Sequence, residues 1–194
     1  RDDVESRGLG DVYKRQSLFI TGLTYSQTVF MENESWNAVK SKAVKENRMI
    51  FMDCYTSWCG PCKGLAQNVF PQPKVGEFLN SNFVCCKYDM EKGEGIMLYK
   101  KYKDNIPGFP TMLVINPVDE SIVHKVVGYT EPDALITALQ DGLDGKTLAV
   151  FQKRYEAGER SLELIKDYCK ALDVAYDLSL IHISSPRDST SSRM

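Results

Sequence analysis

Two cysteines separated by two residues constrain this chain more than any other feature of its sequence. Cys59 and Cys62 lie in the segment 58–63, WCGPCK, and a pair at this spacing can close and reopen a disulfide without moving a domain. The preceding run, Met49–Tyr55, is almost continuously apolar, which is typical of a buried strand. Residues 64–70 have a helix-compatible composition. The pattern predicts thiol–disulfide chemistry at a turn between a strand and a helix.

The order strand, turn, helix places Cys59 at the N-terminus of the predicted helix. Unpaired backbone N–H groups and the positive end of the helix dipole stabilise a thiolate there, and the thiolate is the nucleophile of disulfide exchange. Pro61 fits an early helical position because proline has no N–H to leave unused. We therefore expect Cys59 to be the nucleophile and the more exposed thiol, and Cys62 to resolve the mixed disulfide.

At these residues the chain resembles the thioredoxin family, and three further features carry the same resemblance. Asp53, six residues before Cys59, stands where thioredoxins have a buried carboxylate that passes protons to and from the second cysteine. Lys87 matches a strand lysine that lies near this carboxylate. The segment 106–111, IPGFPT, resembles the cis-proline loop of the family, with Pro110 as the cis residue facing the disulfide.

The resemblance covers roughly residues 32–142 and implies an α/β thioredoxin fold, a central mixed sheet flanked by helices, here with a C-terminal helical extension. It also implies a surface on which an extended segment of a substrate lies. The residues expected to form this surface are Trp58, Gly60, Pro61, Phe109, Pro110 and Thr111.

The residues between the cysteines bear on the direction of electron flow. Gly60 and Pro61 are the pair found in reducing thioredoxins, so the resemblance implies a reductase of protein disulfides that is recharged by an upstream thiol donor. The disulfide itself carries the electrons, so no organic cofactor and no metal is expected.

Elsewhere in the domain, strands and helices alternate, which argues for parallel strands joined by crossovers. Pro71 and Pro73 stop the redox helix early. This early stop resembles a subgroup that includes secreted thioredoxin-like proteins and the periplasmic thioredoxin-like domain of the reductant exporter DsbD. The expected helices are 33–47, 75–79, 96–102 and 132–142, and the further expected strands are 83–88, 112–115 and 122–127. In the first helix, Trp36, Val39, Ala43 and Val44 recur at helical spacing.

Beyond Gly142 the resemblance ends. Apolar residues at helical spacing predict two antiparallel helices joined by a turn at 157–159. The predicted apolar faces are Leu148, Phe151 and Tyr155 in the first helix, and Leu162, Ile165, Cys169 and Leu172 in the second.

The two ends of the chain look foreign to the domain. Residues 1–16 and 179–194 resemble translated sequencing-adapter read-through, and we exclude both from the fold as non-native segments. Residues 17–27 resemble the tail of a secretory signal peptide, with a first β-strand as the alternative. The signal interpretation predicts a periplasmic or secreted protein, and the alternative a cytoplasmic one. The remaining divisions are a thioredoxin-like domain over 28–142 and a helical hairpin over 143–178.

The sequence gives less support to other functions. The net charge of −2, without a basic run interleaved with aromatics, argues against nucleic-acid binding. No stretch is long enough to span a bilayer, so stable membrane insertion is not expected. A zinc half-site would need further ligands, and His124 has no second ligand pair at metal spacing. The alternatives left open are a static disulfide, an isomerase or oxidase, and a binding module that holds a partner with the helical extension.

Four cysteines lie outside the pair. We expect them to be buried free thiols that act as small hydrophobic residues. They are Cys54, Cys85, Cys86 and Cys169.

Overall fold

The computed structural model describes residues 27–32 and 34–175. The two segments predicted to be non-native, and all of the signal-like segment except Gln27, lie outside this part of the chain. Within it, five strands form one sheet in the order β1-β3-β2-β4-β5. The first three are parallel to one another, whereas β4 runs antiparallel to β2 and β5 antiparallel to β4. The mixed α/β sheet predicted from the sequence is confirmed.

Apart from β1, which was not predicted, the strands and helices follow the predicted order along the chain. The strands are β1 (Phe30–Met31), β2 (Met49–Tyr55), β3 (Phe83–Asp89), β4 (Thr111–Ile115) and β5 (Ile122–Val127). The helices are α1 (Trp36–Glu46), α2 (Gly60–Gly64), α3 (Pro73–Asn82), α4 (Glu94–Tyr102), α5 (Pro132–Leu143), α6 (Leu148–Glu156) and α7 (Leu162–Ala175). A π-helical turn, η1 (Leu65–Val69), follows α2, and a 3-10 turn, η2 (Lys103–Asn105), follows α4.

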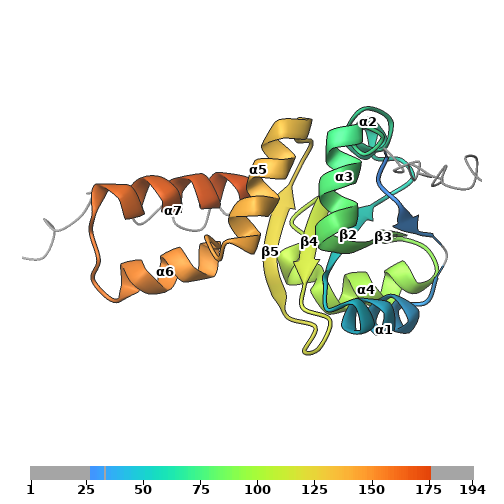
Figure 1. The fold of residues 1–194 in the computed structure, drawn as a ribbon, viewed down its shortest axis with the longest axis horizontal. Helices are drawn as coiled ribbons and strands as arrows, with labels where there is room; N and C mark the ends of the chain where they lie inside the picture. The colour runs from blue at the N-terminus through green and yellow to red at the C-terminus, as the bar shows by residue number, and fades with distance from the viewer. Residues whose placement is uncertain (1–26, 33, 176–194) are drawn as a thin grey trace, which may run out of the picture.

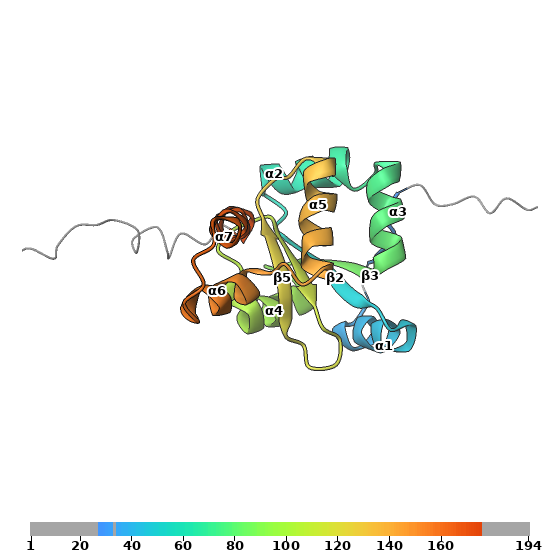
Figure 2. The same cartoon turned by 60° about the vertical axis from the view of Figure 1, so that its left-hand side comes forward.

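Helices cover both faces of the sheet (Figures 1 and 2), with α1 and α4 on one face and α2, α3 and α5 on the other. Successive residues of a strand point to opposite faces, so β2 supplies both layers of the core. Ile50 and Met52 pack with Val39 of α1, whereas Phe51 packs with Leu65 of η1 and Leu139 of α5. None of the helices among the described residues has the length and apolar character needed to cross a membrane.

Helix α1 begins directly after Ser35, whose hydroxyl oxygen accepts the N–H of Ala38 at 3.2 Å. Serine at this position stabilises a helix because it satisfies a backbone donor that has no partner within the helix. Val39 and Ala43 are buried, as predicted. The prediction that Val44 lies on the packed face is wrong, because this side chain is 52% exposed. It follows Ala43 by one residue, which turns it about 100° around the helix axis toward solvent.

The helix after the cysteines is short and irregular. It passes from α2 into η1, and the N–H of Phe70 donates to Leu65 O at 3.0 Å, the five-residue spacing of a π-helix. Pro73 opens α3 in its first turn. The predicted early stop is confirmed, and α3 is longer at both ends than the predicted 75–79.

Helices α6 and α7 form the predicted hairpin beside β5 and α5 (Figures 1 and 2), but α7 buries a different face from the predicted one. Its buried residues are Leu164, Tyr168, Ala171 and Ala175. Leu162 and Ile165 are 69% and 38% exposed, and Cys169 is exposed as well. The prediction for these three residues is wrong, because α7 packs on α6 and β5 with the side that carries Leu164, Tyr168 and the two alanines.

Gly95, at the start of α4, lies against the end of β3. A Cβ atom at this position would be 2.0 Å from the carbonyl oxygen of Asp89. We expect Gly95→Ala to lower the free energy of unfolding by at least about 2 kcal/mol, because backbone must move to accommodate the methyl group. Urea unfolding measures this change.

The control for this measurement is Gly108→Ala, since a Cβ atom there would meet nothing within 4 Å. We expect the control to change the stability by no more than about 0.5 kcal/mol. Equal stabilities of the two variants would contradict the steric argument.

Candidate active site

Strand β2 ends at Tyr55, and a short turn leads from it into α2. Cys59 occupies the N-cap position of α2 in an extended backbone conformation. A disulfide joins it to Cys62, with an S–S distance of 2.06 Å and a Cα–Cα distance of 5.3 Å. The N–H of Cys62 points at the Cys59 Sγ at 3.2 Å. A thiolate on Cys59 would accept the same N–H as a charge-assisted hydrogen bond, so the site is arranged to hold a nucleophilic sulfur.

Both cysteines are buried in this disulfide-bonded form. Cys59 is 3% exposed and Cys62 is 5% exposed, so the prediction that Cys59 is the more exposed of the two is wrong here. The bond to Cys62 and the hydrogen bond from its N–H hold the Cys59 sulfur against the first turn of α2.

Asp53 is a buried carboxylate on the side of the sheet that carries the redox helix. It projects from the same face of β2 as Phe51, which packs with Leu65 of η1. The side chain is 4% exposed, and its Oδ1 has no hydrogen-bond partner. Burial raises the pKa of Asp53 from 3.8 to about 7, and the positive charge of Lys87 lowers it only in part. A carboxyl group with a pKa near neutrality can accept and return a proton at physiological pH.

Lys87 lies beside Asp53, since the two residues are register partners in β3 and β2. Its Nζ is 2.6 Å from Glu32 Oε1 and 5.5 Å from the centre of the Phe30 ring. Among the residues that the structure describes, no ion pair joins Lys87 to Asp53. The structure thus brings the two predicted residues together, but pairs the ammonium group with a third residue that the sequence analysis did not identify.

Aromatic rings form an exposed surface beside the disulfide. Trp58 is 66% exposed, and its ring meets that of Phe109 edge to face at a centroid distance of 6.3 Å. The ring of Tyr99, in α4, lies 5.9 Å from that of Phe109. The indole Nε1 of Trp58 donates to Glu91 Oε2 at 2.9 Å. Tyr99 and Glu91 were not predicted, because neither falls in a motif and only the fold brings them to the site.

The loop before β4 lies between this surface and the core. The Phe109–Pro110 peptide bond is cis, and the carbonyl oxygen of Pro110 accepts the N–H of Gly128 at 2.8 Å. Thr111 is fully buried, and its hydroxyl donates to Gly108 O at 2.7 Å. The Thr111 side chain is therefore not exposed on the predicted substrate surface, because its hydroxyl is used to fix the loop.

His124 is a buried strand residue of β5. Its ring lies against α5, where a Cβ atom on Gly142 would be 2.8 Å from its Cγ. Burial lowers the pKa of His124, although the carboxylate of Asp141 opposes the change. In the part of the chain that the structure describes, no group of three or more His, Cys, Asp or Glu side chains is placed to hold a metal ion.

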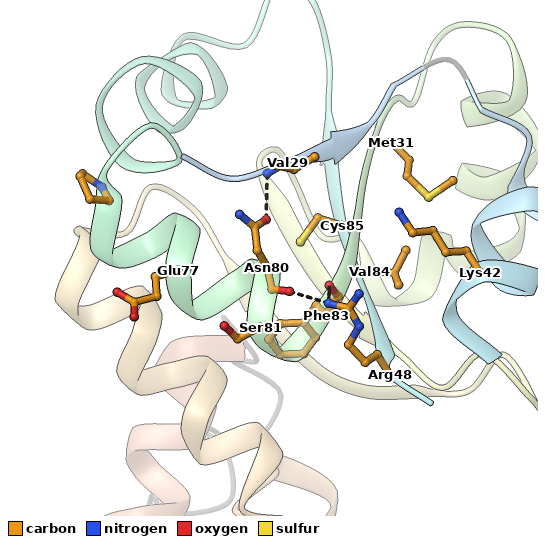
Figure 3. A pocket seen from close by; sticks show the side chains of 11 residues that line it. Val29, Met31, Lys42, Arg48, Glu77, Asn80, Ser81, Phe83, Val84 and Cys85 are labelled. Carbon is orange, nitrogen blue, oxygen red and sulfur yellow. Dashed lines mark hydrogen bonds between the residues drawn. The ribbon is translucent and has the colours of Figure 1, made fainter. Parts of the chain in front are cut away.

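A cavity of about 470 Å³ lies at the β1 edge of the sheet, and none of its lining residues belongs to the redox site. Figure 3 shows the side chains that line it. The Asn80 Oδ1 accepts the N–H of Val29 at 2.9 Å there, and Arg48 Nη1 donates to the carbonyl oxygen of Phe83 at 3.1 Å. Cys85 lines the cavity. Cys85, Cys54 and Cys86 are buried free thiols, as predicted, whereas Cys169 is exposed on the outer side of α7.

The sheet, the two-residue spacing of the disulfide and the buried carboxylate together define a thiol–disulfide protein of the thioredoxin fold. Residues 31–117 match a family model described as Thioredoxin-like. The solution structure of a disulphide-isomerase candidate from Bacteroides thetaiotaomicron is 38% identical to this chain, with a TM-score of 0.53 over 60% of this chain and 93% of the other. The chain therefore belongs to the thioredoxin-like family.

Curated relatives agree with this assignment. The thiol:disulfide interchange protein DsbD of Pseudomonas fluorescens is 29% identical over 93 residues, which are 47% of this chain and 16% of that protein. Thioredoxin-2 of Pyricularia oryzae is 30% identical over 100 residues, which are 50% of this chain and 52% of that protein. The matched region is thus about half of one relative and a smaller part of the other.

Proposed function

We propose that this domain reduces disulfides in other proteins through the Cys59 and Cys62 pair. The observation that carries the proposal is the Cys59–Cys62 disulfide at the start of α2, with the N–H of Cys62 aimed at the Cys59 sulfur. This disulfide is the form that the domain would have after it has delivered two electrons. The family match and the relatives named for thiol–disulfide exchange support the same chemistry.

The first step is attack by Cys59. In the reduced protein its thiolate attacks one sulfur of the substrate disulfide. A new bond forms between Cys59 and that sulfur, the bond within the substrate breaks, and the other substrate sulfur leaves as a thiolate that takes up a proton. The exposed ring of Trp58 and the partly buried ring of Phe109 give an extended segment of the substrate an apolar surface beside the reacting atoms.

The second step releases the substrate. The carboxylate of Asp53 takes the proton of the Cys62 thiol, and the resulting thiolate attacks the Cys59 sulfur of the mixed disulfide. The Cys59–Cys62 bond forms, the bond to the substrate breaks, and the second substrate sulfur leaves and is protonated. Two electrons have then passed to the substrate, and an upstream thiol donor restores the dithiol. The cycle requires no bound organic cofactor.

We further propose that the domain works in the periplasm or outside the cell. The signal-like composition of residues 17–27 supports this location, as does the similarity to DsbD. The test is cell fractionation of the source organism with an antibody against the domain. Recovery in the cytoplasm would favour the alternative location.

The reduction potential of the Cys59 and Cys62 pair tests the direction of transfer. We expect a value close to that of thioredoxin, about −270 mV, because Gly60 and Pro61 add no charge that stabilises the thiolate further. Equilibration with glutathione or a dithiol buffer measures it, in the Cys169→Ser background so that the exposed thiol does not contribute.

A potential near that of protein disulfide isomerase, about −180 mV, would instead favour isomerisation. The similarity to the Bacteroides thetaiotaomicron disulphide-isomerase candidate makes this the second function to consider. If the reduced pair fails to form a disulfide in any buffer, the redox function is excluded.

A further inference from the structure

Three charged residues form one row across the sheet, from its edge to its centre. The register pairs Phe30 with Cys85 and Met31 with Cys86, so Glu32, the next residue, stands opposite Lys87. Lys87 is in turn the register partner of Asp53. Residues opposite one another on neighbouring strands project from the same face, so all three side chains lie on the face that the redox helix covers.

The exposed fraction of the side chain falls along this row, from the edge of the sheet to its centre. The side chain of Glu32 is 58% exposed, that of Lys87 is 32% exposed, and Asp53 is 4% exposed. The ammonium group of Lys87 is therefore at the border between solvent and core, with a carboxylate on each side. The ion pair at 2.6 Å joins it to the outer carboxylate, and its position over the Phe30 ring also lies on the β1 side. The inner carboxylate is left with an Oδ1 that has no hydrogen-bond partner.

We propose that Glu32 is a positioning residue for the redox reaction: it holds the ammonium group of Lys87 toward the sheet edge and thereby keeps Asp53 a strong enough base to deprotonate Cys62. The inference rests on the proposed function for its role in turnover, but the link between the three charges is a property of the row alone. Without Glu32, the flexible lysine stem is free to bring its charge toward the unpaired oxygen of Asp53.

The other charged groups near Lys87 have partners or positions that leave Glu32 as its anchor. These groups line a hollow of about 480 Å³ at the ends of β2 and β3, together with Tyr55 and Tyr88. They are Glu34, Asp89, Lys92 and Glu94. Asp89 pairs with Lys92 at 3.0 Å, and Glu94 accepts the backbone N–H of Trp36. The remaining charged residue of this hollow is Glu34. On the other side of Asp53 in the sheet, its register partner is the apolar Met112 of β4.

The test is the titration of Asp53 in the oxidised protein, followed by the ¹³C chemical shift of its carboxyl group. In the wild type we expect the midpoint near 7, in keeping with the pKa that burial gives this group. In Glu32→Gln we expect the midpoint to fall by about one unit or more, because an opposite charge within a few ångströms lowers a carboxyl pKa by about 1 to 3 units.

Two controls distinguish an effect on Asp53 that acts through Lys87 from the direct effect of removing a negative charge. Glu34→Gln removes the same charge from the same segment, and we expect its midpoint to stay within about 0.3 units of the wild type. In a Lys87→Met background, Glu32→Gln should have little effect, because the group that it holds is gone. An unchanged midpoint in Glu32→Gln, or an equal fall with and without Lys87, would overturn the proposal.

A second measurement connects the row to turnover. Reduced protein in the Cys169→Ser background is mixed with Ellman's reagent, and the second release of thionitrobenzoate reports attack by Cys62 on the Cys59 adduct. We expect the pH of half-maximal rate to move downward in Glu32→Gln by the same amount as the titration of Asp53. A rate profile that does not move would contradict the positioning role. A wild-type protein that titrates as expected but reduces no protein disulfide would instead remove the proposed function and leave the link between the charges in place.

Discussion

Replacing Cys59 by serine will abolish the reduction of protein disulfides, to the rate of a solution without the protein. The serine hydroxyl is not ionised near neutral pH and cannot form the mixed disulfide, so the first step is lost entirely. Turnover of insulin disulfides, with dithiothreitol as the electron source, measures the effect. Cys62→Ser retains the first step and loses the second, and we expect it to accumulate covalent adducts with its substrates, which a non-reducing gel shows directly.

The matched control is Cys169→Ser, which removes an exposed thiol that lies outside the pair. We expect full activity from it. Adducts that form equally well in Cys59→Ser would mean that another cysteine is the nucleophile, and the assignment of Cys59 would then be wrong. The adducts of Cys62→Ser also identify the natural substrates by mass spectrometry.

Raising the pH from 4 to 8 will destabilise the oxidised wild type, relative to Asp53→Asn, by about 4 kcal/mol. The pKa of Asp53 is about 7 in the folded protein against an ordinary value of 3.8, and each unit corresponds to about 1.4 kcal/mol. Because the folded state binds the proton more tightly, the stabilising contribution is fully present below pH 3.8. It is lost as the pH rises toward 7, and the difference levels off above that value.

Urea unfolding of both proteins at a series of pH values measures this difference. Other groups titrate over the same range, but they do so in both proteins and cancel in the comparison. Asp53→Leu provides a second reference without a carboxyl group, and it should give the same dependence on pH although its absolute stability differs. Parallel curves for wild type and both variants would show that the carboxyl group is not held protonated by burial.

The strands and the motif were the most predictable parts of this structure. Strand β5 spans the predicted 122–127, and β2 spans the predicted Met49–Tyr55. These segments are determined by local composition, because short runs rich in apolar and β-branched residues between turn signals favour strands. The pairing of Cys59 with Cys62 and the burial of Asp53 could likewise be predicted, since both depend on short spacings within one strand–turn–helix unit.

The parts that escaped prediction depend on contacts between distant segments. Strand β1 has only two residues and no periodicity that a sequence can show, so Glu32 could not be assigned to the row with Lys87 and Asp53. The apolar stripe of Leu162 and Ile165 predicts a packed face on α7, yet the helix packs with the side that carries Leu164, Tyr168 and two alanines. When a helix has two faces that are apolar enough to pack, the choice between them depends on the tertiary partners, which the helix sequence alone does not show.

The two edges of the sheet bear on how this domain would interact with an extended substrate chain. One edge is β1, which presents only two residues, and at the other edge α7 contacts β5 at a steep angle (Figures 1 and 2). A long, exposed edge strand would offer its unpaired N–H and C=O groups to any extended chain, which could then pair with it as an additional strand. If the domain reduces disulfides of incompletely folded proteins, as proposed above, each turnover would bring such a chain close to the sheet. The short β1 and the neighbouring α7 leave little free edge for it to pair with, so the substrate would be held through its sulfur atom and released when that bond is exchanged.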